Sequence, residues 1–67
     1  MVTREHLYRN VRLLSSADGA PAGSVAALIE YFGDDAMIEF VDQPGLPNVI
    51  TVPCRILEPY DLGSQAA

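Results

Sequence analysis

The densest group of side chains that could do chemistry is acidic and lies near the middle of the chain. It consists of Asp34, Asp35, Glu39 and Asp42. Carboxylate oxygens are the ligands that Ca²⁺ and Mg²⁺ prefer. This spacing matches no calcium-binding loop, however, and on a strand Asp35 and Glu39 would stand about 13 Å apart. We therefore expect no metal site and interpret the cluster as a solvated turn followed by a polar strand face.

The chain contains one histidine and one cysteine, His6 and Cys54, which are far apart in the sequence. A histidine that acts as a general base needs a positioned partner, and no triad pattern surrounds His6, so we read it as a surface or interface residue. Arg55 could lower the pKa of the Cys54 thiol, but one neighbouring cation is little support, and a small, partly buried hydrophobic residue is the simpler reading. The glycine-containing stretch 19–23 lacks the Lys-Ser/Thr of a phosphate loop. We expect no catalytic residues, no cofactor and no enzyme.

The charge of the chain is negative and unevenly distributed. The net charge is −5, from nine carboxylates and four arginines with no lysine. The first 17 residues have a balance of +2 and the rest a balance of −7. Because nucleic-acid binding depends on basic side chains that replace counterions on phosphates, we expect no nucleic-acid partner.

Hydropathy along the chain predicts no membrane partner. No stretch approaches the roughly 20 apolar residues that span a bilayer, and residues 1–6 lack the apolar core of a signal peptide. A single cysteine fits a reducing compartment. We expect a cytoplasmic location.

Alternating apolar residues and turn formers predict short strands. A helical turn over 3–8, with Thr3 as its N-cap, should precede them. A last helical turn or short strand is expected at 54–57. The strands fall at 10–14, 25–31, 36–41 and 49–53.

The connections between these strands differ in kind. Residues 15–23 form a loop too long for a tight hairpin, so the first two strands need not be hairpin neighbours. Gly33-Asp34-Asp35 indicates a hairpin turn, which favours a strand over a helix for 24–32. Pro44-Gly45 suits a type II turn, and Pro53 restricts the fourth strand to an edge or an end.

These elements together predict a single all-β domain, a small, highly curved β-barrel of four to five short strands with a short N-terminal helical turn. The expected boundaries are 1–9 for the N-terminal segment, 10–60 for the barrel and 61–67 for a flexible tail. A further pattern is formed by four stretches: Gly23-Ser24-Val25, Tyr31 with Gly33-Asp34, Ile38-Glu39-Phe40-Val41-Asp42, and Val52-Pro53 with Ile56. This pattern resembles small bacterial SH3-like barrels of uncharacterised families. The resemblance implies an SH3-like barrel but no binding or catalytic residue.

The two faces of the central hairpin predict an interaction surface. The residues expected to fill the barrel are Val25, Ala27, Ile29, Ile38 and Phe40. Hydrophobic residues make up 49% of so short a chain, more than one small core encloses, so an exposed patch and a homo-oligomer are expected. The positive N-terminal segment could pack on the acidic body of a neighbouring subunit. The predicted interface residues are Leu28, Met37, Val41, Leu14 and Tyr8.

Other readings stay open at this point. The N-terminal segment could instead cover the patch within one chain, through Leu7 and Tyr8. A groove of aromatic residues with an acidic rim would suit a peptide-binding SH3-like adaptor; the aromatic residues are Tyr8, Tyr31, Phe32 and Tyr60. SH3-like modules also accompany nucleic acids, but the basic residues that they need are missing here.

Overall fold

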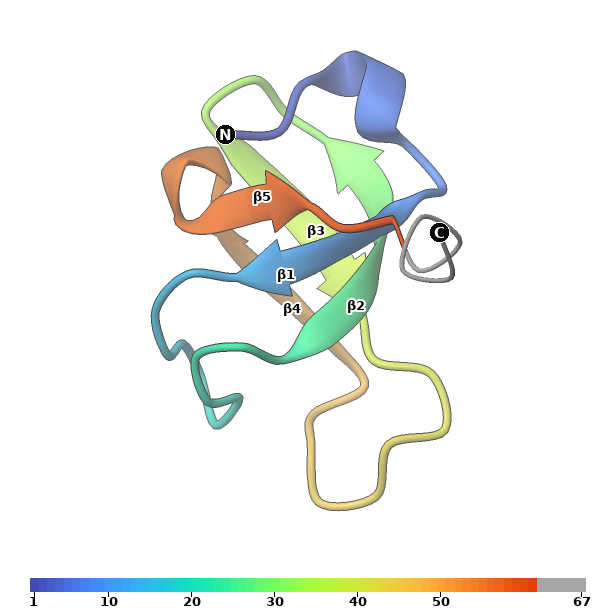
Figure 1. Ribbon diagram of the computed structural model, residues 1–67, viewed down its shortest axis with the longest axis vertical. Coiled ribbons are helices and arrows are strands. Elements are labelled where there is room, and N and C mark those ends of the chain that lie inside the picture. Colours follow the sequence, from blue (N-terminus) through green and yellow to red (C-terminus); the bar gives the residue numbers. More distant parts are fainter. Residues whose placement is uncertain (62–67) are drawn as a thin grey trace.

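The protein is a single antiparallel sheet of five strands, with strand order β4-β3-β2-β1-β5 (Figure 1). The computed structural model describes residues 1–61, so the predicted tail lies outside the described residues except for Asp61. The predicted all-β class and N-terminal helical turn are confirmed. The elements are η1 (Arg4–His6), β1 (Asn10–Leu13), β2 (Val25–Tyr31), β3 (Asp35–Glu39), β4 (Val49–Pro53), η2 (Cys54–Ile56) and β5 (Leu57–Pro59).

The predicted barrel is not closed, because β4 and β5 form the two ends of the strand order. The short η2 turn leads the chain from β4 to β5, and β5 then pairs with β1, with Leu13 opposite Leu57. The sheet nevertheless curls on itself. Val52 of β4 and Leu57 of β5, from opposite edges, are both buried in one hydrophobic core. The correct description is an open, curled sheet.

The long loop between β1 and β2 joins hairpin neighbours after all. β1 pairs directly with β2, and within the loop Ala17 and Ala20 exchange backbone hydrogen bonds of 2.9 and 2.8 Å. The two residues between them, Asp18 and Gly19, have φ of 45° and 92°. Positive φ at both central positions is the geometry of a type I′ turn, and Asp-Gly is a preferred pair there. The loop is thus folded back by a tight turn of its own, and Ala20 reaches the core.

A β-bulge in β2 decides which side chains enter the core. Leu28 pairs with Ile38, whereas Glu30 pairs with Met37, so Ile29 is the extra residue. A bulge of this kind reverses the inward and outward alternation for the rest of the strand. Before it, Ala26 and Leu28 face the core.

After the bulge, Tyr31 is the residue of β2 that packs against the core. The prediction that Val25, Ala27 and Ile29 fill the interior is therefore wrong for the first part of the strand.

The N-terminal segment packs on the core rather than on the outer face. Val2 is fully buried, and half-buried Leu7 packs against the core. The Tyr8 N–H donates a 2.6 Å hydrogen bond to the Leu28 carbonyl. Thr3 occupies the predicted N-cap position, and its N–H donates to His6 Nδ1 at 2.9 Å. The segment thus completes the core from one end of the sheet (Figure 1).

Candidate interaction surface

The predicted interface centres on the outer face of the β2–β3 hairpin, and one of its residues is misplaced. Leu28 is fully buried, because the bulge turns the first part of β2 over. It belongs to the core with Ile38, its partner in β3. Met37 alternates with buried Ala36 and Ile38 and is half-buried on the opposite, outer face. The prediction that Leu28 faces outward is therefore wrong, while the placement of Met37 on the outer face is correct.

Three apolar residues of β2 that were expected in the core lie on the outer face instead. They are Val25, Ala27 and Ile29, all half-buried. None of them is among the partly buried residues that pack against the core. Ala27 pairs with Glu39 across the hairpin, on the same face as Met37. The outer face of the hairpin is therefore apolar in β2 up to the bulge and mixed in β3, and beyond the bulge exposed Glu30 stands opposite Met37.

The sequence contains only a weak signal for which residues of β2 face outward. Every residue of 25–29 is apolar, so alternation alone cannot distinguish the two faces before the bulge. The small side chain of Ala26 fits the crowded interior beside Val11, its partner in β1. Side-chain volume, rather than hydropathy, carries the information here.

The remaining predicted interface residues are exposed but are spread over the molecule. Val41, 56% exposed, directly follows Phe40 at the end of the hairpin. Leu14 follows β1, where its N–H donates to the Ile56 carbonyl beside β5. Tyr8 is 81% exposed, with φ of 64°. Of these three, Val41 continues the outer face of the hairpin.

A shallow groove runs over this outer face. Its apolar wall includes Val25, Ala27 and Val41, and Glu39 stands at its acidic side. Gln43 closes one end, because its side-chain Nε2 donates a 2.8 Å hydrogen bond to the Val25 carbonyl. Because β3 ends at Glu39, the Gln43 amide donates to the Val25 carbonyl the hydrogen bond that a neighbouring strand would otherwise donate.

Two of the arginines near the N-terminus, Arg4 and Arg12, make contacts with other side chains of the same chain. Arg12 forms an ion pair with Glu58, which lies directly opposite on β5. The same guanidinium lies over the ring of Tyr60, 5.2 Å from its centroid, and that of Arg4 lies 5.1 Å from the centroid of Tyr31. Such cation–π contacts are favourable. They occupy two of the four residues expected to form an aromatic groove.

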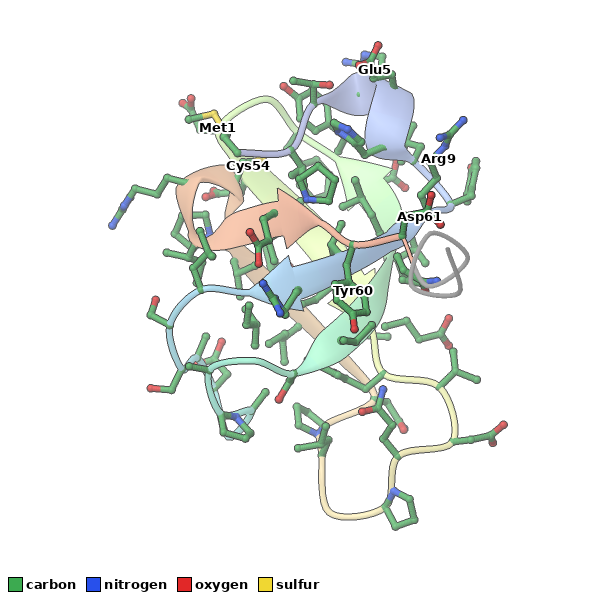
Figure 2. All side chains as sticks on the ribbon, viewed as in Figure 1. Met1, Glu5, Arg9, Cys54, Tyr60 and Asp61 are labelled. Atoms are coloured by element: carbon green, nitrogen blue, oxygen red, sulfur yellow. The ribbon has the colours of Figure 1, made fainter. Side chains whose placement is uncertain are left out.

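A second hollow lies where the N-terminal segment meets the end of β5 (Figure 2). It has a volume of about 470 Å³. Figure 2 shows Tyr60 and Asp61 following β5, with Arg9 above them. The lining residues are His6, Arg9, Asn10, Pro59, Tyr60 and Asp61. Since Nδ1 of His6 accepts the Thr3 N–H, a neutral ring carries its proton on Nε2.

The side chains considered for chemistry do not form a reactive site. Burial raises the pKa of the Cys54 thiol, Asp35 and Asp34 raise it further, and the N-terminal amine opposes them. The thiol is therefore protonated near neutral pH, which is the opposite of an activated nucleophile. Within residues 1–61, no group of three or more His, Cys, Asp or Glu side chains is arranged to hold a metal ion.

No helix in the described part of the chain has the length and apolar character needed to cross a membrane. Comparison with known proteins adds no further assignment: no family model, curated protein or solved structure matches the chain.

Proposed function

We propose that this protein is a non-enzymatic protein-interaction module that associates with further copies of itself through the outer face of the β2–β3 hairpin. The single observation that carries the proposal is a half-buried apolar row that lies outside the hydrophobic core of the described chain, Val25, Ala27, Ile29 and Met37. Exposed Val41 extends this row. Apolar faces of this kind mark sites of protein association, and in a closed homo-oligomer the same patch meets itself across a symmetry axis.

We further propose that the curled sheet is an open member of the SH3-like class. The support is the strand order, in which the last strand returns to pair with the first. A single turn of 3₁₀ helix, η2, lies between β4 and β5 and contributes partly buried Ile56 to the core. Because SH3-like folds host many unrelated functions, this likeness bears on architecture alone.

The experiment that tests the function is replacement of Met37 by glutamate. A carboxylate at the centre of the outer face must be desolvated in the associated state but stays hydrated in the monomer. We expect Met37→Glu to shift the protein from oligomer to monomer in light scattering, with an increase of about a hundredfold or more in the dissociation constant.

The matched control is Ser16→Glu, which places the same charge at an exposed position in the loop between β1 and β2. It tests whether any added negative charge suffices to prevent association. An effect of Ser16→Glu as large as that of Met37→Glu would contradict an interface on the hairpin. Wild-type protein that is monomeric at tens of micromolar would overturn the proposal.

A further inference from the structure

The two edges of the sheet differ in what their backbones offer to another strand. The edges are β4 and β5. An edge strand presents unpaired N–H and C=O groups, and proteins usually guard it with charge, proline or a bulge. β4 carries no charged residue, and four of its five residues are β-branched, with proline only at its end.

The hydrogen bonds that bracket the β3–β4 ladder show which groups of β4 face outward. The Phe40 N–H donates to Asn48 O at 2.9 Å, and the Cys54 N–H donates to Asp34 O at 2.8 Å. Both contacts belong to the same antiparallel register, in which Ile38 is opposite Ile50. Since bonded and non-bonded pairs alternate along such a ladder, the even-numbered residues of β4 bond to β3.

The odd-numbered residues of β4 therefore direct their backbone groups toward the open edge. Val49 and Thr51 each present an N–H and a C=O there, while Pro53 presents only a C=O. Both Val49 and Thr51 are exposed. Among the residues that the structure describes, no hydrogen bond outside the strand ladders involves the backbone of either residue.

The β5 edge offers no comparable donor. Tyr60 donates its N–H to Asn10 O, and Leu14 donates to Ile56 O, so the even-numbered residues of this segment bond to β1. The outward residues are then Leu57 and Pro59. The Leu57 N–H is already bonded to Cys54 O, and proline has no N–H. Strand addition at β5 is thus blocked, and β4 is the edge that can accept another strand.

We propose that β4 pairs antiparallel with β4 of a second copy of this chain, about a two-fold axis at Ile50. This inference rests on the proposed self-association and adds to it a second contact, made by the edge of the sheet rather than by its outer face. In this register each Val49 exchanges both backbone hydrogen bonds with Thr51 of the other copy. Ile50, which is half-buried and packs against the core of its own copy, lies opposite itself at the axis as a non-hydrogen-bonded pair.

Two properties of the strand favour its own copy as the partner. The spacing of the outward groups is self-complementary, since Val49 and Thr51 lie symmetrically about Ile50. The strand is also uncharged, so copies that each carry a net charge of −5 bring no like charges together along it. The pairing extends the sheet across the axis, and the outer faces of both copies lie on the same side.

The direct test is amide hydrogen exchange, measured residue by residue by NMR at low and high protein concentration. We expect protection of Val49 and Thr51 to increase about tenfold or more with concentration. Ile50 and Val52, which bond to β3, should be protected at both concentrations. Association without any gain in protection at Val49 and Thr51 would overturn the edge pairing and leave association through the outer face intact.

Substitution provides an independent test. Val49→Pro removes one outward N–H at the first residue of a strand, a position that tolerates proline, and should weaken association about tenfold or more. Thr51→Val keeps the N–H and the shape and should associate like wild type. If Val49→Pro does not fold by circular dichroism, Val49→Lys replaces it, with like charges beside the axis. An undiminished association of the folded variant would refute the pairing, whereas a monomeric wild type would refute the proposed function as well.

Discussion

Both faces of the β2–β3 hairpin carry apolar side chains, but only those of the inner face belong to the hydrophobic core. On the inner face, Leu28 and Ile38 are opposite each other and fully buried. On the outer face, Ile29 and Met37 are half-buried and belong to no core. Hydropathy does not separate the two sets. The difference lies in the curl of the sheet, which encloses one face and leaves the other to solvent or to a partner.

This contrast implies that the two faces contribute to different equilibria. Removing a side chain from the inner face should lower the free energy of unfolding of the monomer, because it leaves a cavity. Changing a side chain on the outer face should instead alter the association equilibrium. A small domain buries a smaller share of its surface than a large one, so the loss of either contribution should be easy to detect.

The largest effect is expected from Leu28→Ala. We expect it to lower the free energy of unfolding by about 2–5 kcal/mol, the usual range for deletion of a fully buried leucine side chain. Ile29→Ala, at the adjacent position on the other face, should cost less than about 1 kcal/mol in the monomer. Denaturant titration at a concentration low enough to keep the protein monomeric measures both. Equal losses for the two variants would contradict the assignment of the faces.

The sequence was sufficient to predict the first four strands and insufficient to predict the faces of one of them. The bounds of β2 and β4 agree with the structure because turn residues and β-branched residues mark them. The bulge at Ile29 leaves no comparable mark. A single inserted residue exchanges the two faces of the strand. The position of the insertion depends on how side-chain volumes fill the core, which is a property of the whole fold.

Closure of the sheet and the type I′ turn are two further features that local sequence signals did not predict correctly. Asp18-Gly19 is a strong local signal for a tight turn, but it lies inside a stretch of small residues that reads as a long loop. Conversely, the sequence shows that Pro53 suits an edge, and the structure agrees that β4 is one. The resemblance to a barrel suggested closure, which depends on whether two distant edges meet. The interaction of the outer face with a partner stays a prediction.

A second test of the inner face uses Cys54, which is buried in the core at the end of β4. Burial raises the pKa of its thiol in the folded state, as do Asp35 and Asp34. Because the folded protein resists deprotonation, the stability that the neutral thiol contributes is fully present below the unfolded pKa of about 8.5. It is lost as the pH rises through the folded pKa.

We therefore expect the free energy of unfolding to decline on the alkaline side, more steeply in wild type than in Cys54→Ala. Urea titrations at a series of pH values measure this difference. The alanine variant supplies the matched control, since it retains the tyrosines and carboxylates that also titrate. Identical alkaline slopes for both proteins would show that the thiol is not held in the core.

The smallest effect is expected on the outer face, at the ion pair between Arg12 and Glu58. Both side chains are partly exposed, at 44% and 31%, so water screens their attraction and ordering them costs entropy. We expect Glu58→Gln to lower the free energy of unfolding by less than about 1 kcal/mol. The contact of the guanidinium with the Tyr60 ring does not involve Glu58, so it should persist in the variant and limit the loss further.

Salt separates the electrostatic part of this effect from the packing part. Screening at about 1 M salt should remove most of the difference between Glu58→Gln and wild type, whereas the deficit of Leu28→Ala should persist because a cavity is not screened. Suppose instead that Glu58→Gln lowers the free energy of unfolding as much as Leu28→Ala does, and that salt does not reduce this loss. The β1–β5 end of the outer face would then be buried in the folded protein. The ion pair would then belong to a covered surface, and the distinction between an enclosed and an open face would hold only for β2 and β3.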